Sequence, residues 1–454
     1  MFQLDLGAAN KYCDGLSRRS FLTLGVAGMA SLALPDVLRA REQAARGGTT
    51  RKTSVILIWL DGGPSHLDLY DLKPDAPAEI RGIWKPIRSR VPGFDITEMF
   101  PRQARLTDKF SVVRSLHHGT GDHFAGMHRM LTAKDLGVAT ANTAPKFPSI
   151  GSVASHQLGP RHDAMPAYAV LPSSRNFYLG AHMLGTQHNP FMPDGDPNNP
   201  RYAVRNLNLA QGLTLERMEE RRTLARHFDG VLRGLEDSPA AQGMDRYAQQ
   251  AFDFLAGGTA RRAFDLGAEP AHVRDRYGRN TWGQSTLLAR RLIEAGTTFV
   301  TVFLGGWDSH WNLQGRMEDY LPKVDSLVSA LFEDLDQRGL LETTLVVLCG
   351  EFSRTPRMND GGNGGPPRSM GTPGRDHWGE AMFCLLGGGG VKGGQVVGST
   401  DRLGTSPHTR PVTPPNIHAT IYRVLGIDPR LQLRDPSGRP VNVLDDPRPI
   451  EELL

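Results

Sequence analysis

Cysteine is scarce in this 454-residue chain, which has only three, so a fold built on disulfides is excluded. The chain also has no large excess of charge of one sign. It contains 52 Lys and Arg and 48 Asp and Glu, and the excess of +4 is spread along the chain. This balance gives no indication of a nucleic-acid partner. The uncharged N-terminal run is shorter than the roughly 20 residues that cross a bilayer, so no stable membrane span is expected.

The composition that remains is that of a globular protein. Hydrophobic residues make up 39% and charged residues 22%, and low-complexity tracts are absent, which excludes a disordered, collagen-like or coiled-coil chain. The 51 glycines and 32 prolines predict many loops and tight turns.

The first 45 residues have the pattern of an export signal. Residues 13–22 (CDGLSRRSFL) place paired arginines before an uncharged run over residues 21–34, which Pro35 ends. This arrangement resembles a twin-arginine signal, and the alternative is a buried N-terminal helix with a chance arginine pair. We therefore predict a signal and linker over residues 1–45, a periplasmic or secreted protein, and the twin-arginine export machinery as a partner.

The cysteines fit this prediction. Cys13 would leave with the signal, whereas Cys349 and Cys384 stand inside apolar runs and are expected to be buried free thiols. A disulfide between these two remains the alternative.

Four apolar runs predict strands of a central sheet. They cover residues 53–60, 298–304, 343–349 and 381–386, and helices are expected over residues 282–295 and 317–338. Runs that are apolar on both faces are typical of buried parallel strands, and their alternation with helices predicts a doubly wound α/β fold. Residues 50–450 are thus expected to form one large domain.

A different pattern interrupts this alternation between about residues 160 and 280. Charged amphipathic helices are expected over residues 213–235 and 247–255, after a loop rich in Pro, Asn, Asp and Gly. We interpret this part as an insertion that covers the strand ends.

Acidic residues follow three of the predicted strands, and histidines stand nearby. Asp61, Asp308 and Glu351 end strands, and the ligands of a sheet of this type collect at the carboxyl ends of its strands. His310 and His377 are close to such acids in sequence. Carboxylates with imidazoles are ligands of zinc, manganese or iron, whereas sites made of oxygen alone suit magnesium or calcium. The alternative is that the acids cap helices and the histidines lie in loops.

Six segments resemble the DUF1501 family and, through it, the alkaline phosphatase and sulfatase superfamily. They are residues 13–22, 60–68 (LDGGPSHLD), 305–310 (GGWDSH), 350–357 (GEFSRTPR), 374–378 (GRDHW) and 413–426 (TPPNIHATIYRVLG). The resemblance implies a three-layer α/β/α sandwich with a mixed, mostly parallel central sheet. It also implies two adjacent divalent metal ions, for which zinc is preferred and magnesium, manganese or calcium are alternatives.

The resemblance assigns roles position by position. Asp61 matches the acid at the metal nearer the nucleophile, and Glu351 stands where a strand-end Asp is expected, followed by Phe352 in place of the family's histidine. Asp308 and His310 match ligands of the other metal. His377 matches the histidine before the next strand, with Asp376 as a ligand or as a partner that orients one.

The nucleophile departs most from the family pattern. His123 stands at the position that supplies a Ser, Thr or Cys, with Thr120 as the nearest hydroxyl and Ser65 as a second candidate. His123 is open to three roles: nucleophile, metal ligand, or base for metal-bound water.

Two functions follow as hypotheses. The first is an exported metal-dependent hydrolase of phosphate or sulfate esters, whose partner is an anionic ester or a sulfated or phosphorylated glycan. Arg354 and Arg375 are the preferred anion-binding residues, ahead of Arg114 and Arg129. The second is a catalytically silent member that serves as a binding or envelope structural protein.

Overall fold

Seven strands form the central sheet of the computed structural model. The model describes residues 52–137, 145–174, 177–204, 258–361 and 371–454. Across the sheet the order is β11-β4-β10-β7-β1-β6-β5. These strands are β1 (Ser54–Asp61), β4 (Phe110–Leu116), β5 (Tyr168–Leu171), β6 (Phe299–Gly305), β7 (Thr344–Cys349), β10 (Met382–Gly388) and β11 (Val396–Val397).

Most pairings in this sheet are parallel. β1 pairs in parallel with both β6 and β7, β5 with β6, and β11 with β4. β10 is the exception, since it runs antiparallel to both β7 and β4. The sheet is therefore mixed and mostly parallel, as the family resemblance implies, and β10 is the strand that departs from the parallel direction favoured by its apolar run.

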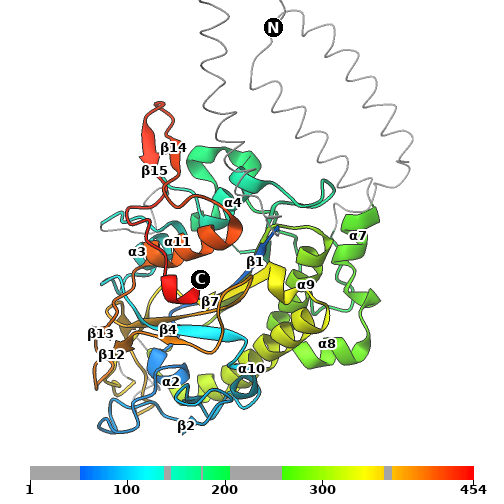
Figure 1. Ribbon diagram of the computed structural model, residues 1–454. Coiled ribbons are helices and arrows are strands. Elements are labelled where there is room, and N and C mark those ends of the chain that lie inside the picture. The colour runs from blue at the N-terminus through cyan, green and yellow to red at the C-terminus, as the bar shows by residue number, and fades with distance from the viewer. Residues whose placement is uncertain (1–51, 138–144, 175–176, 205–257, 362–370) are drawn as a thin grey trace, which may run out of the picture. The chain divides into compact units, whose positions relative to one another are not determined.

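Helices cover both faces of the sheet (Figure 1). Alternate residues of a strand point to opposite faces, and Ile56, Ile58 and Leu60 of β1 belong to one hydrophobic core. Val55, Leu57 and Trp59 belong to the other. The first core contains residues of α9 (Thr281–Ala295) and α10 (Leu313–Gln337), and the second contains residues of α3 (His123–Thr132), α4 (Ile150–Leu158) and α11 (Pro414–Leu425). The result is a three-layer α/β/α sandwich.

The remaining elements are short. The helices are α2 (His66–Leu69), α7 (Gly258–Phe264) and α8 (Ala271–Tyr277). Four two-stranded pairs are β2 (Pro86–Ile87) with β3 (Ile96–Thr97), β8 (Ser353–Arg354) with β9 (His377–Trp378), β12 (Ser399–Thr400) with β13 (Pro407–Thr409), and β14 (Gln432–Arg434) with β15 (Pro440–Asn442).

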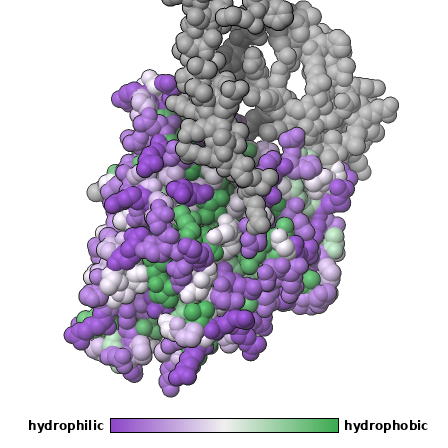
Figure 2. All heavy atoms as spheres, viewed as in Figure 1, coloured by the Kyte–Doolittle hydropathy of each residue, from purple (hydrophilic) through white to green (hydrophobic). Residues whose placement is uncertain are grey.

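Apolar side chains are well buried in this arrangement. Leu158, at 42%, is the one large hydrophobic side chain that is exposed among the described residues. Hydrophilic residues cover most of the face seen in Figure 2. In the described part of the chain, no helix combines the length and the apolar character needed to cross a membrane.

The four predicted strands and two predicted helices are all present, within a few residues of the expected limits. Cys349 and Cys384 are buried free thiols, as expected. The segment predicted to be an insertion, residues 160–280, differs in part from that prediction. It contains β5, which pairs with β6 and belongs to the edge of the central sheet. The export signal and the predicted helices over residues 213–235 and 247–255 lie outside the described residues.

Candidate metal centre

One edge of the sheet collects the predicted site residues because of the direction of its strands. β1, β6 and β7 run parallel, so the residues that follow them, Asp61, Asp308 and Glu351, share this edge. β10 runs the opposite way, and its beginning therefore lies at the same edge. This reversal brings in His377, which precedes β10.

The N-terminus of α3 adds a fifth side chain. The carboxylate of Asp122 accepts a hydrogen bond from the backbone N–H of Ala125 at 2.8 Å and caps the helix. The cap makes His123 the first residue of α3, because the N-cap residue itself lies outside the helix. The ring of His123 then faces the loops that follow β6 and β7.

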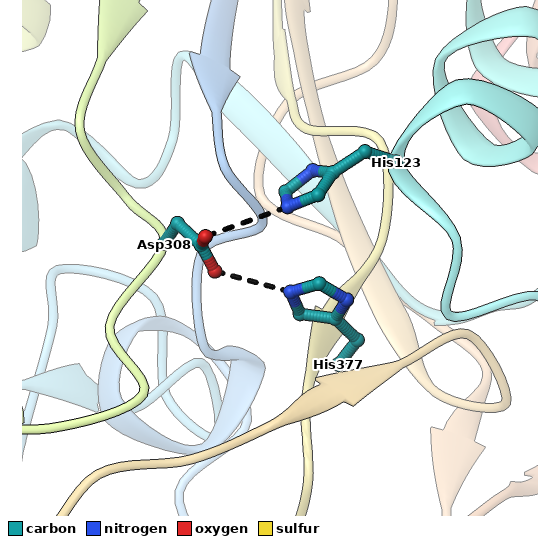
Figure 3. Close-up of side chains that lie close together, drawn as sticks. All are labelled: His123, Asp308 and His377. Atoms are coloured by element: carbon teal, nitrogen blue, oxygen red, sulfur yellow. Dashed lines mark hydrogen bonds and ion pairs between the residues drawn. The ribbon is translucent and has the colours of Figure 1, made fainter. Parts of the chain in front are cut away.

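Asp308 is the centre of the cluster (Figure 3). Its Oδ1 lies 3.0 Å from Nε2 of His310 and 3.1 Å from Nε2 of His377. Its Oδ2 lies 3.5 Å from Nε2 of His123. The Nε2 atoms of His310 and His377 are 3.0 Å apart. The side chain of Asp308 is 45% exposed, so the cluster is open to solvent.

The other ring nitrogen of each histidine contacts an oxygen. The Nδ1 contacts are Glu351 Oε1 at 2.8 Å for His123, Asp376 Oδ1 at 2.6 Å for His310, and the Gly121 carbonyl at 2.7 Å for His377. A carbonyl or an ionised carboxylate only accepts, so each Nδ1 is inferred to carry the proton. In the neutral rings, all three Nε2 lone pairs then point toward the carboxylate of Asp308.

This arrangement of acceptors fits a cation. Acceptors that face each other at 3.0–3.1 Å repel unless a positive charge lies among them. Ligand atoms bound to zinc at about 2.0–2.1 Å in a tetrahedron lie about 3.3 Å apart. Asp308 Oδ1 and the Nε2 atoms of His310 and His377 approach this spacing. His123, Asp308 and His377 also offer ligand atoms that all lie within 4.8 Å of one another.

The charges in the cluster shift the pKa values of its members. Burial would raise the pKa of Asp308, but hydrogen bonds from His123 and His377 and the charge of Arg354 hold it well below its usual range. For His123, burial favours the neutral ring, yet Asp308 and Glu351 outweigh that effect and raise the pKa to about 9. Without a metal, a proton on His123 therefore offsets part of the negative charge of these carboxylates.

A second acidic group adjoins the first. Glu351 is fully buried, and its Oε1 accepts hydrogen bonds from the backbone N–H of Gly62 at 2.8 Å and from His123. Its Oε2 is buried and has no hydrogen-bond partner among the described residues. Burial and then the charge of Glu351 raise the pKa of Asp61 to about 6. A half-buried carboxylate beside a fully buried one with an orphaned oxygen fits a second cation or a shared proton.

Only glycine fits at position 62 in this arrangement. Its φ is +113°, and a Cβ on it would lie 2.4 Å from the backbone nitrogen of Asp308. The glycine thus allows the loop after β1 to approach the loop after β6, and this close contact sets the position of Asp308.

Arg354 positions Asp308 and does not stand free to bind a substrate. Its side chain is 1% exposed, and its Nη2 lies 2.6 Å from Asp308 Oδ1. The same guanidinium donates to the carbonyls of Gly62, Gly63 and Arg375. Arg354 therefore ties the loops after β1 and β6 to β8, and the predicted role in anion binding is replaced by a positioning role.

Arg375, predicted to bind an anion, has its guanidinium engaged within the fold. Its side chain is fully buried, and all five of its N–H groups have acceptors. These acceptors are the carboxylate of Asp68 at 3.0 Å and the backbone carbonyls of Thr355, Pro356, Ile80 and Arg81. No donor remains for a substrate, so Arg375 holds loops together.

The two candidate hydroxyls are engaged elsewhere. Ser65 is buried and its Oγ donates to Asp68 at 2.5 Å. Thr120 Oγ1 accepts a hydrogen bond from the backbone N–H of Asp122 at 3.2 Å. No contact between described residues brings either hydroxyl to Asp308 or to the three histidines. The structure therefore does not support Ser65 as a nucleophile, and it leaves Thr120 outside the cluster.

Arg114 and Arg129 also have other partners. Arg114 donates to the carbonyl of Asp95 at 2.7 Å, and Arg129 pairs with Asp135 at 2.6 Å and donates to the carbonyl of His118. Both arginines thus contact loops, and neither has a contact with the cluster among the described residues.

Sequence reasoning missed two contributors to the site. The carbonyl of Gly121 fixes the ring of His377, and a backbone group of this kind leaves no side-chain signal. Phe352 was noted only as the absence of a histidine. Its ring packs against His123 and His377 at 4.8 and 4.5 Å between centroids, so it fixes the orientation of both rings.

Asp376 should influence metal affinity through His310. Replacing Asp376 with asparagine removes the charged acceptor of the His310 Nδ1 proton. Loss of a group that orients a metal-binding histidine typically lowers the affinity for the metal by about 10–100-fold. We expect a weakening of that size in a zinc titration of the Asp376→Asn protein. Asp319→Asn on α10, where the carboxylate is 59% exposed, is the matched control. Unchanged affinity in Asp376→Asn would show that Asp376 does not orient His310.

Comparison with known proteins gives one family and several similar structures. The model of a family described as "Protein of unknown function (DUF1501)" matches residues 52–454. No curated protein matches the chain.

The similar structures include proteins from three bacteria. PsFucS1 sulfatase from Pseudoalteromonas sp. has a TM-score of 0.37 at 14% identity, over 87% of this chain and 71% of that chain. A member of the alkaline phosphatase superfamily from Vibrio parahaemolyticus has a TM-score of 0.39 at 9% identity, over 83% and 67%. The alkaline phosphatase of the Antarctic bacterium TAB5 has a TM-score of 0.36 at 12% identity, over 83% and 99%. With TM-scores this low, these likenesses carry no weight for the site.

Proposed function

The chain belongs to the DUF1501 family, and from that premise we propose that it is a metal-dependent hydrolase of phosphate or sulfate esters that acts outside the cytoplasm. One observation carries the proposal: three imidazole Nε2 atoms converge on the carboxylate of Asp308 while each Nδ1 is tied to an acceptor. Such a set binds a divalent cation, and zinc suits its mixture of nitrogen and oxygen ligands.

The proposed ligands form two neighbouring groups. Asp308, His310 and His377 would hold one metal, and Asp61 with Glu351 would contribute to a second. A bound divalent metal would polarise an ester oxygen and make a bound water more acidic. The residues of the chain supply the orientation: Asp376 and the carbonyl of Gly121 aim two of the rings.

His123 is proposed to move a proton in the reaction. Glu351 holds its Nδ1, so Nε2 faces the open side of the cluster, where the carboxylate of Asp308 is exposed. We propose that water attacks the phosphorus or sulfur atom as its bond to the leaving oxygen breaks, and that His123 Nε2 accepts the proton of the attacking water and returns it to the leaving oxygen. This role replaces a hydroxyl nucleophile, because no described contact brings Thr120 or Ser65 to the cluster.

A second candidate function is a catalytically silent binding or envelope protein. Two departures from the pattern that the superfamily resemblance implies favour it: His123 stands where a hydroxyl or thiol is expected, and Phe352 stands where a metal-binding histidine is expected. A silent member would keep the metal cluster as a structural element and would turn over no ester.

Elemental analysis and assays on the purified full chain test these proposals. We expect at least one divalent metal per chain and hydrolysis of aryl phosphate or aryl sulfate. The Asp308→Asn protein should lose both, because the central carboxylate loses its charge. Stoichiometric metal without hydrolysis would support the silent alternative. The proposal is wrong if the chain binds none of zinc, manganese, magnesium or calcium and hydrolyses neither ester after each is added.

The predicted export of the chain enters this proposal as well. The arginine pair and the uncharged run lie within residues 1–51, outside the described residues. Replacing Arg18 and Arg19 with lysine should keep the protein in the cytoplasm of a host that uses the twin-arginine route. Export of the variant at the normal level would contradict the assignment.

A further inference from the structure

Positive charge is concentrated in one part of the chain. Residues 81–109 contain seven Lys and Arg and three Asp and Glu, a net charge of +4. The whole 454-residue chain also has a net charge of +4, so the remainder is neutral overall. The positive excess is therefore local, which corrects the even spread inferred from the composition.

The same segment forms a surface groove of about 490 Å³. Its lining residues are Ile87, Arg88, Arg90, Pro101, Ala104 and Arg105. The three arginines are exposed, and no carboxylate lines the groove. We call it the arginine groove.

Hydrogen bonds fix the two walls of the arginine groove. One wall follows β2, and the other belongs to the short helical turn Gln103–Leu106. The N–H of Arg90 donates to the carbonyl of Ala104 at 2.8 Å. The hydroxyls of Ser89 and Thr107 are 2.9 Å apart, and Thr107 is fully buried. The spacing of the arginines is thus set by the backbone, which reduces the entropy lost on binding.

Two of the three guanidinium groups have no ion-pair partner among the described residues. Arg88 and Arg105 form no ion pair there. Arg90 lies 3.4 Å from Asp108, but both side chains are well exposed, at 65% and 38%, so the pair is weak in water. The groove therefore presents guanidinium groups that are not neutralised from within the fold.

We propose that the arginine groove binds the sulfate or phosphate groups of an anionic polysaccharide. Guanidinium forks match the oxygens of such groups with two parallel hydrogen bonds. Three exposed arginines around one groove suit a polymer with repeated anionic groups better than a single small ion. The apolar lining is aliphatic and offers no aromatic ring on which a nucleic-acid base could stack. The groove is separate from the residues of the metal centre.

Titration of the full chain with dextran sulfate, neutral dextran and a single-stranded oligonucleotide tests this proposal. We expect salt-dependent binding of dextran sulfate and no binding of neutral dextran. The double variant Arg88→Gln/Arg105→Gln should weaken binding by at least about tenfold, since it removes two charge-assisted contacts. The matched control is Arg423→Gln/Arg430→Gln, which removes the same charge from two other exposed positions.

The outcomes separate specific binding from its alternatives. Equal weakening in both double variants would show non-specific attraction and overturn the proposal. Tighter binding of the oligonucleotide than of dextran sulfate would assign the groove to nucleic acid instead. Absence of binding to dextran sulfate would also overturn it. Because binding is measured without turnover, these results do not depend on whether the metal centre hydrolyses esters.

Discussion

The His377→Ala protein should bind zinc at least about 100-fold more weakly than the unmodified protein and lose hydrolysis by about 10³-fold or more. The imidazole lies at the meeting point of the cluster, with Nε2 3.1 Å from Asp308 and 3.0 Å from His310. Removal of this imidazole leaves only two of the three proposed ligands of that metal. Zinc content after dialysis and steady-state hydrolysis of aryl esters measure the two effects.

His408→Ala is the matched control, because His408 is an exposed histidine on β13. That variant should keep the zinc affinity and the turnover of the unmodified protein. If His377→Ala retains zinc with unchanged affinity, the metal is bound elsewhere. If it loses zinc while hydrolysis continues, the centre is structural and the reaction takes place without it.

The sheet was predictable where its strands are buried on both faces. β1, β7 and β10 are continuous apolar runs because helices cover both of their faces, and burial of this kind is visible in a sequence. The sequence did not predict β4, β5 or the two-residue strand β11. The sequence of β4 (FSVVRSL) mixes polar and apolar residues, and β5 has only four residues, too few to define a pattern.

The reversal of β10 decides the geometry of the site, and it could not be derived from the local sequence. An apolar run reads the same in either strand direction. The antiparallel pairing of β10 with β7 nevertheless places the start of β10 at the same edge of the sheet as the ends of β7, β1 and β6, and thereby brings His377 to Asp308. The mixed sheet was expected only from the family resemblance, because the periodicity of the sequence does not indicate the direction of a strand.

Two arginines show that the position of a residue in a motif does not determine its role. Arg354 and Arg375 both stand beside proposed ligands in sequence, which favoured anion binding. Whether an arginine faces a substrate or the interior depends on loops that are remote in sequence, such as the carbonyls of Ile80 and Arg81. Those contacts could not be predicted from the residues of the motif.

The Arg375→Ala substitution should lower the free energy of unfolding by about 3–5 kcal/mol. Its guanidinium is fully buried, pairs with the equally buried carboxylate of Asp68, and satisfies four backbone carbonyls. Removing it leaves the buried negative charge of Asp68 without a positively charged partner and four backbone carbonyls without this donor. The shift of the urea midpoint at an unchanged slope measures this loss.

Two further variants separate the structural role of Arg375 from a role in binding the substrate. Arg423→Ala on α11 removes an exposed arginine and should change stability by no more than about 0.5 kcal/mol. Arg375→Lys keeps the charge beside Asp68 but loses the planar fork, so it should recover part of the stability. An anion-binding arginine would behave in the opposite way, with a raised KM and an unchanged midpoint. Since all five N–H groups already have acceptors within the fold, we expect the midpoint to move and the KM of the folded fraction to stay.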